Sequence, residues 1–134
     1  GGAGQVAAFR LFSAVLAIGN LQFRPKAGNT DGFHEPSDPG ALTTVASLLE
    51  VPPKGLETKF TSRVISTGKG SSSYTVPLSA TECADVRDAL AKSLYVELFS
   101  WVVGMCNDAQ KSEVPMNSTD EERFIGLLDI FGFE

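Results

Sequence analysis

The sequence predicts a mainly α-helical chain that carries one β-hairpin and one terminal core strand. Apolar residues recur at steps of three and four in three separate stretches, which is the spacing of helices with one buried face. A glycine-rich turn within 61–77 separates two runs that contain β-branched residues, which predicts the hairpin. A short apolar run without alternation, at 124–128, predicts a strand buried on both faces of a largely parallel sheet.

Composition places the chain among globular proteins. Of its 134 residues, 43% are hydrophobic and 20% are charged, and no apolar run is long enough to span a bilayer. The net charge of -5 argues against a sequence-independent grip on nucleic acid. Cys83 and Cys106 are too few and too distant for a zinc site or a disulfide framework, so we expect reduced thiols in a cytosolic protein. The start has no initiator Met and no signal-peptide pattern, and we expect both ends to be cuts from a longer chain.

The first predicted helix covers 5–18 and has a broad buried face. Gly19-Asn20 is a typical C-terminal stop. Residues 21–23 predict a short extended piece, and 24–39 predict a surface loop because Gly, Pro, Asn, Asp and Ser gather there. His34 is the only histidine and lies in this loop without a cysteine nearby, so we expect a solvated structural role.

A second helix is predicted from Pro39 to Leu49. Asp38 followed by proline is the signature of an N-cap and a first turn. Val-Pro-Pro at 51–53 should end the helix, and 54–60 predict one more helical turn.

The predicted hairpin turns at Gly-Lys-Gly-Ser, 68–71, a fragment that invites comparison with a phosphate loop. That loop requires an earlier glycine and a Ser or Thr directly after the lysine. Arg63 and Gly70 stand at those two positions, so the sequence disfavours a phosphate loop.

The charge around the hairpin is one-sided. No acidic residue occurs between Glu57 and Glu82, whereas Lys59, Arg63 and Lys69 are basic, so an otherwise acidic chain presents one cationic hairpin. From the residues alone a solvated hairpin is the favoured interpretation, and a contact surface is the alternative.

A long helix should begin after Ser79, because Ser79 and Glu82 form a capping box. It is expected to run to about Cys106 as a core helix without chemistry of its own. Its predicted core-facing stripe comprises Val86, Leu90, Leu94, Leu98, Trp101, Val102 and Met105. The polar stretch 107–122 that follows is expected to be a loop, and its glycosylation sequon at 117–119 requires a secretion signal that the sequence lacks.

Asp129 directly follows the predicted terminal strand. Ligands bind at the carboxyl ends of strands in open α/β sheets, where a carboxylate can hold a hydrated magnesium ion beside a triphosphate. Gly132 has no Cβ, so its backbone can approach a phosphate and donate its N–H. The residues alone leave two interpretations level, a nucleotide switch and a core strand that runs into an ordinary turn.

The stretch 128–134, Leu-Asp-Ile-Phe-Gly-Phe-Glu, resembles the switch II segment of the myosin motor domain at nearly every position. Two more stretches are similar to the same family in the same order. They are 14–23, which resembles a helix that usually ends His-Leu-Gly-Asn-Ile-x-Phe, and 87–101, which begins Arg-Asp-Ala-Leu-Ala-Lys. Ala17 and Ile18 depart from the commoner His-Leu pair.

The resemblance implies that 1–134 are a partial myosin motor domain, the upper actin-binding region ending at switch II, with no complete domain. The fold class would be a fragment of an α/β P-loop NTPase head, with ATP and Mg2+ as cofactors. Asp129 would hold the Mg2+ through a bound water, Gly132 would donate its N–H to the γ-phosphate, and Glu134 would pair with an arginine of switch I.

The hairpin is similar to the loop of the upper domain that touches actin, which implies that Arg63 and Lys69 contact the actin filament. The whole motor would be an actin-activated Mg-ATPase of the cytoplasmic actin cytoskeleton, with no nucleic-acid partner, no transmembrane segment and any light chains bound outside this chain. The fragment alone is expected to be inactive, because the phosphate loop and switch I would lie upstream. The alternative is a non-hydrolysing actin tether derived from a myosin head. The presence of Asp129, Gly132 and Glu134 favours the motor.

Overall fold

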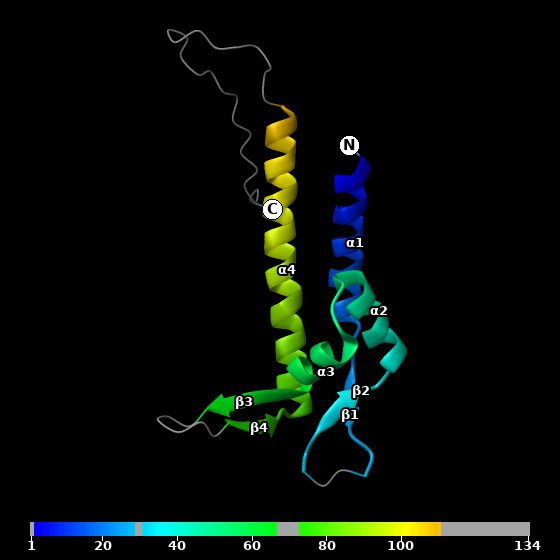
Figure 1. The fold of residues 1–134 in the computed structure, drawn as a ribbon, viewed down its shortest axis with the longest axis vertical. Coiled ribbons are helices and arrows are strands. Elements are labelled where there is room, and N and C mark those ends of the chain that lie inside the picture. Colours follow the sequence, from blue (N-terminus) through cyan, green and yellow to red (C-terminus); the bar gives the residue numbers. More distant parts are fainter. Residues whose placement is uncertain (1, 29–30, 67–72, 111–134) are drawn as a thin grey trace, which may run out of the picture.

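The fold is an antiparallel pair of long helices with the smaller elements gathered at one end (Figure 1). The computed structural model describes residues 2–28, 31–66 and 73–110. The two long helices, α1 (Gly2–Gly19) and α4 (Ala80–Ala109), lie side by side. Two short helices and two small antiparallel sheets lie near the end of α1 and the start of α4. The prediction of a mainly helical chain is therefore confirmed, and the expected terminal strand at 124–128 lies outside the described residues.

The hydrophobic core sits where these elements meet. Its buried members are Ile18, Leu21, Leu42, Val45 and Phe60. Complete burial of one such side chain contributes about 1.5–3 kcal/mol, so this cluster holds the end of α1 against the short helices.

The upper part of the molecule departs from the prediction of broad buried faces. On α1, Val6, Phe9 and Leu16 are 68%, 72% and 72% exposed. On α4, Leu98 is buried, but Trp101 is 40% exposed, so the expected stripe is buried only over part of its length. The reason is geometric, since the small elements cover only one end of the long helices (Figure 1).

The helix α2 (Pro39–Leu49) has the bounds that the sequence predicts. Asp38 is the N-cap, and its Oδ1 accepts a hydrogen bond of 2.8 Å from the Gly40 N–H. The residue that caps the end of the helix is Glu50, whose backbone is left-handed with φ 56°. Most helix ends in this conformation use glycine, because a Cβ is unfavourable there.

The expectation of a surface loop over 24–39 is wrong at both ends of that stretch. Strand β1 (Phe23–Pro25) pairs antiparallel with β2 (His34–Pro36). The Phe23 ring lies 5.8 Å from the Phe60 ring, which ties this sheet to the core. His34 lies in β2 and is partly buried, and its Nδ1 is 3.1 Å from the Gly32 carbonyl oxygen. Strands of three residues are too short to produce a recognisable alternation in sequence.

The predicted helical turn at 54–60 is a nine-residue helix, α3 (Pro53–Thr61). It leads without a break into the hairpin of β3 (Ser62–Ser66) and β4 (Ser73–Pro77), whose antiparallel pairing confirms the prediction. Pro53 is the first residue of α3 and Pro77 is the last residue of β4. At such boundaries the missing N–H of proline removes the fewest backbone hydrogen bonds.

Two helices, α1 and α4, are long and apolar enough to cross a membrane by length and composition alone, contrary to the expectation of no such run. This is weak evidence, since core helices of soluble proteins pass the same test. Both helices also carry charges within their length, including Arg10 on α1 and Lys92 and Glu97 on α4. Each charge near the centre of a spanning helix would cost about 2.5–3.5 kcal/mol, which opposes insertion.

Candidate functional site

The predicted site residues divide into two groups. Asp129, Gly132, Glu134 and Lys69 lie outside the described residues, so their expected roles stay predictions. Arg63 is described, on β3 opposite Val76. Within 2–28, 31–66 and 73–110, no group of three or more His, Cys, Asp or Glu side chains could hold a metal ion.

The hairpin projects sideways from the end of the molecule where α4 begins (Figure 1). Four consecutive residues of β3, from Arg63 to Ser66, are exposed, and so are Ser73, Tyr74 and Thr75 of β4. The Arg63 side chain is 60% exposed. The hairpin therefore offers a cation among apolar side chains, which suits a protein contact better than a hydrated surface loop.

A cavity of about 270 Å³ lies at the base of the hairpin. Two cationic and two acidic residues contribute to its wall, together with Ser62, Leu78 and Val86. The charged residues are Lys59, Arg63, Glu82 and Asp85. The base of the hairpin is therefore close to neutral, although the sequence between Glu57 and Glu82 contains no acid.

Glu82 uses its two carboxylate oxygens differently. Its Oε2 accepts hydrogen bonds from the Ser79 N–H at 2.8 Å and from the Ser79 hydroxyl at 2.9 Å, which confirms the predicted capping box of α4. Its Oε1 lies 3.9 Å from Nη1 of Arg63. The hydrogen bonds from Ser79, backbone first, hold the pKa of Glu82 below its usual value, with a smaller contribution from the Arg63 charge.

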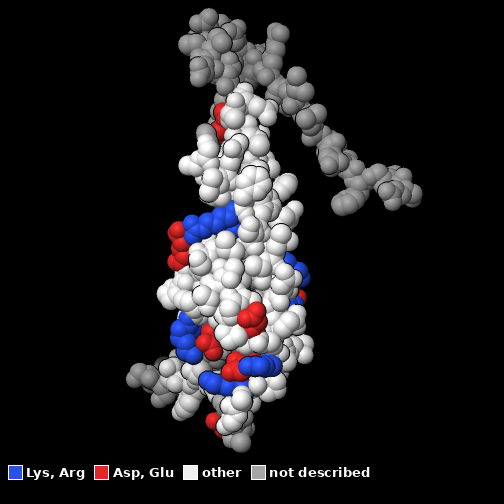
Figure 2. Space-filling view, turned by 90° about the vertical axis from the view of Figure 1, so that its right-hand side faces the viewer, with Lys and Arg blue, Asp and Glu red and all other residues white. Residues whose placement is uncertain are grey.

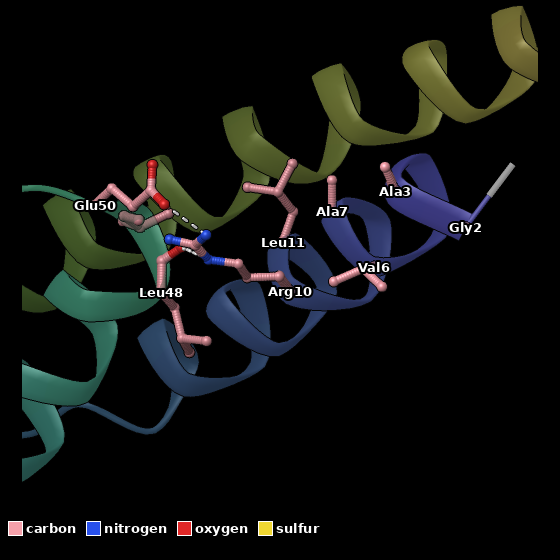
Figure 3. Close-up of a pocket in the computed structure, with 9 residues that line it drawn as sticks. Gly2, Ala3, Val6, Ala7, Arg10, Leu11, Leu48 and Glu50 are labelled. Carbon is pink, nitrogen blue, oxygen red and sulfur yellow. Dashed lines mark hydrogen bonds and ion pairs between the residues drawn. The ribbon is translucent and has the colours of Figure 1, made fainter.

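Arg10 of α1 forms hydrogen bonds and an ion pair with residues at the end of α2 (Figure 3). Its Nε donates to the Leu48 carbonyl at 2.9 Å, its Nη2 donates to the Ser47 carbonyl at 3.1 Å, and its Nη1 lies 2.7 Å from Glu50 Oε1. The guanidinium thus adds hydrogen bonds to two carbonyls in the last turn of α2, and one of them, the Ser47 carbonyl, also accepts from the Glu50 N–H. A cavity of about 540 Å³, lined mostly by apolar residues of α1 and by Leu48 and Leu49, lies beside it.

Arg87 links α4 to the chain that leaves α1. Its Nη1 donates to the Leu21 carbonyl at 2.7 Å, and its Nε donates to Asp88 at 2.7 Å. Only 14% of the Arg87 side chain is exposed. The hydrogen bond from Arg87 holds the pKa of the Asp88 carboxyl below its usual value.

Sequence reasoning missed three of these partnerships: Arg10 with α2, Arg87 with Leu21, and Arg63 with Glu82. The sequence does show Glu82 at the end of the stretch without acidic residues, but from the sequence we predicted only its role in the helix cap and not its pairing with Arg63. Contacts between residues far apart in the chain leave no local pattern, so no signal in this sequence pointed to Arg10 or Arg87.

Comparison with known families decides what kind of protein this is. The sequence profile of the family described as "Myosin head (motor domain)" matches residues 3–134. The chain belongs to the myosin head family. The match runs through both long helices, the hairpin and the stretch 128–134, so the resemblance stated from the sequence is confirmed at the level of the family.

Several fungal relatives named Myosin-1 are similar to this myosin head segment. The protein of Mycosarcoma maydis is 40% identical over 129 residues, which cover 94% of this chain and 9% of the relative. The proteins of Coccidioides immitis and Aspergillus oryzae are 38% and 39% identical over 129 residues, again 94% of this chain, and 10% of each relative. The chain therefore spans about a tenth of the length of the relatives that it matches.

The two cysteines of this myosin head segment differ in access. Cys83 is fully buried, its Sγ lies 3.7 Å from the Leu78 carbonyl, and burial raises the pKa of its thiol. Cys106 is exposed and lies on the wall of an apolar cavity of about 490 Å³ between α1 and α4. Both thiols are free, as the sequence predicts.

Charge is unevenly spread over the myosin head segment. On the face shown in Figure 2, most charged side chains lie in the half that carries the sheets and short helices, and the other half is largely uncharged. The exposed apolar side chains Val6 and Phe9 belong to α1.

Proposed function

We propose that the chain is part of an actin-based motor that hydrolyses ATP, located on the cytoplasmic actin cytoskeleton. The observation that carries this proposal is the match to the myosin head family over 3–134, which includes the acid-and-glycine stretch at its end. The exposed side chain of Arg63, on the described part of the hairpin, supports the proposed binding to actin.

The nucleotide chemistry is assigned to Asp129, Gly132 and Glu134. A carboxylate and a backbone N–H suit a triphosphate with bound Mg2+. The carboxylate would face the metal, because Mg2+ prefers oxygen ligands and keeps bound waters, and the N–H would donate to a phosphate oxygen. Magnesium would neutralise charge on the phosphates, and Asp129 would hold it through one of those waters. Gly132 would direct its N–H to the γ-phosphate, and Glu134 would pair with an arginine of switch I. Hydrolysis would then be transfer of a phosphoryl group to water, promoted by positioning and charge stabilisation.

Glu134→Ala in the motor head that carries this chain tests the nucleotide assignment. The substitution leaves the partner arginine unpaired in the closing site, so ATP should still bind while single-turnover hydrolysis slows by about two orders of magnitude or more. Gly132→Ala should likewise admit ATP and block hydrolysis, since a methyl group would stand where the backbone approaches the phosphate. A wild-type rate in Glu134→Ala would contradict the assignment. Absence of ATP turnover in the unsubstituted head would instead support the alternative of a non-hydrolysing tether.

The actin contact is assigned to Arg63 and Lys69 of the hairpin. Arg63→Glu combined with Lys69→Glu reverses both charges, and we expect weaker binding to actin filaments at low salt with basal ATP hydrolysis nearly unchanged. A control is Lys26→Glu, which reverses an exposed charge directly after β1 and should leave actin binding intact. Unaltered co-sedimentation of the doubly substituted head with actin would rule the contact out.

A further inference from the structure

We propose that Glu82 is a positioning residue that restrains Arg63 in the free hairpin and so weakens the grip of the hairpin on its partner. The proposal rests on the proposed actin contact of Arg63. The observation that carries it is the distance of 3.9 Å between Arg63 Nη1 on β3 and Glu82 Oε1 in the first turn of α4.

The two carboxylate oxygens of Glu82 have different partners: Oε2 takes part in the helix cap, and Oε1 lies near Arg63. Oε2 receives both hydrogen bonds from Ser79, which fixes the carboxylate at the start of α4. Oε1 is left facing Arg63. A carboxylate held in place by a helix cap loses little further side-chain entropy when it pairs with a cation, so it is a better partner than a free surface glutamate.

The pair is also open to competition. The side chains of Arg63 and Glu82 are 60% and 46% exposed, and ion pairs between exposed side chains are weak. A partner that recognises a cationic hairpin presents acidic groups, and those groups must draw Arg63 away from Glu82 while they approach the negative charge of Glu82 itself. Glu82 therefore opposes binding twice, by occupying Arg63 and by repelling the acidic partner.

Glu82→Gln separates this role from the helix cap. Glutamine can replace glutamate in a capping box, so its amide oxygen keeps the bond from the Ser79 N–H while the charge facing Arg63 disappears. In the motor head that carries this chain, we expect Glu82→Gln to tighten actin binding about two- to five-fold at low salt, the range that corresponds to one exposed ion pair. The gain should shrink as salt is raised.

Two comparisons show whether the gain passes through Arg63. In an Arg63→Gln background, the gain from Glu82→Gln should be clearly smaller, because the guanidinium that it releases is gone and only the repulsion between Glu82 and the partner is removed. Asp85→Asn removes the same charge from the wall of the same cavity, and no hydrogen bond or ion pair joins Asp85 to Arg63 in the described part of the chain. Asp85→Asn should therefore change affinity less than Glu82→Gln.

The outcomes are distinguishable. A gain that is undiminished without Arg63, or an equal gain in Asp85→Asn, would reduce the effect to net charge and overturn the proposal. Unchanged affinity in Glu82→Gln, in a head where reversing Arg63 and Lys69 does weaken binding, would overturn the role of Glu82 and leave the proposed actin contact standing. If reversing those two charges has no effect either, the proposed contact itself is wrong.

Discussion

At the scale of single residues, Glu50 combines an unfavourable backbone with favourable side-chain contacts. Its φ of 56° is the only left-handed value at a non-glycine residue in the described part of the chain, and its carboxylate pairs with Arg10. The pair is exposed, with 74% of the Glu50 side chain accessible, so its contribution is small. The left-handed backbone costs a residue with a Cβ about 1–2 kcal/mol.

Glu50→Gly should therefore stabilise the end of α2, because glycine removes the backbone strain and Arg10 keeps its bonds to the carbonyls of Ser47 and Leu48. Glycine also has greater freedom in the unfolded chain, which offsets part of this gain. We therefore expect a net stabilisation of the last turn of α2 by about 0.5 kcal/mol. Hydrogen exchange of the last turn of α2 in the motor head would measure it. Glu50→Ala is the matched control, since it loses the same carboxylate and keeps the strain. Equal exchange in the two variants would contradict this explanation.

At the scale of elements, the start of α4 should be sensitive to acid. The pKa of Glu82 is lowered from its ordinary value of 4.5, so the capping box contributes its full stabilisation above that value. The contribution is lost as the pH falls through the lowered pKa of the folded state. In a peptide of residues 77–99, circular dichroism should show helix loss on acidification from pH ~6 to pH ~3 that exceeds the loss in its Glu82→Gln counterpart. All other acidic residues are the same in the two peptides, so a difference in helix content between the peptides that stays constant across this range would contradict the prediction.

The elements also show what this sequence can predict and why. The bounds of α2 and the start of α4 were predictable, because Asp38-Pro39 and the Ser79–Glu82 capping box act within one turn of the helix that they begin. The strands β1 and β2 were not, since they are three residues long and are held by pairing across a turn. The bond from Arg87 to Leu21 joins residues 66 apart in sequence, and only the folded chain brings them together. The proposed roles of Asp129 and Glu134 come from the family resemblance, because local chemistry alone left a nucleotide switch level with an ordinary turn.

At the scale of the whole molecule, the long helices carry more apolar surface than the described residues cover. Val6, Phe9 and Leu16 of α1 and Val96 and Phe99 of α4 are between 59% and 72% exposed. We expect the isolated chain to self-associate at micromolar concentrations, because large apolar side chains that are exposed on both long helices favour association. Size-exclusion chromatography with light scattering would measure the mass. A monomer with a cooperative thermal transition would contradict the expectation.

A pair of variants tests the source of that association. Phe9→Lys with Leu16→Lys places two charges on the exposed face of α1 and should reduce the associated fraction. Thr43→Lys with Thr44→Lys adds the same charge at exposed positions of α2, where no large apolar side chain is removed. If both pairs reduce association equally, net charge rather than the apolar face is responsible.

The contrast between the two thiols makes the chain suited to site-specific spectroscopy. Thiolates are the reactive species, so burial and the raised pKa of Cys83 protect it from maleimides under conditions in which Cys106 reacts. A fluorophore attached at Cys106 would report from the far end of α4, about 35 Å along the helix from Cys83 at a rise of about 1.5 Å per residue. The natural sequence of the chain thus already contains one attachment point, with no cysteine to be removed first.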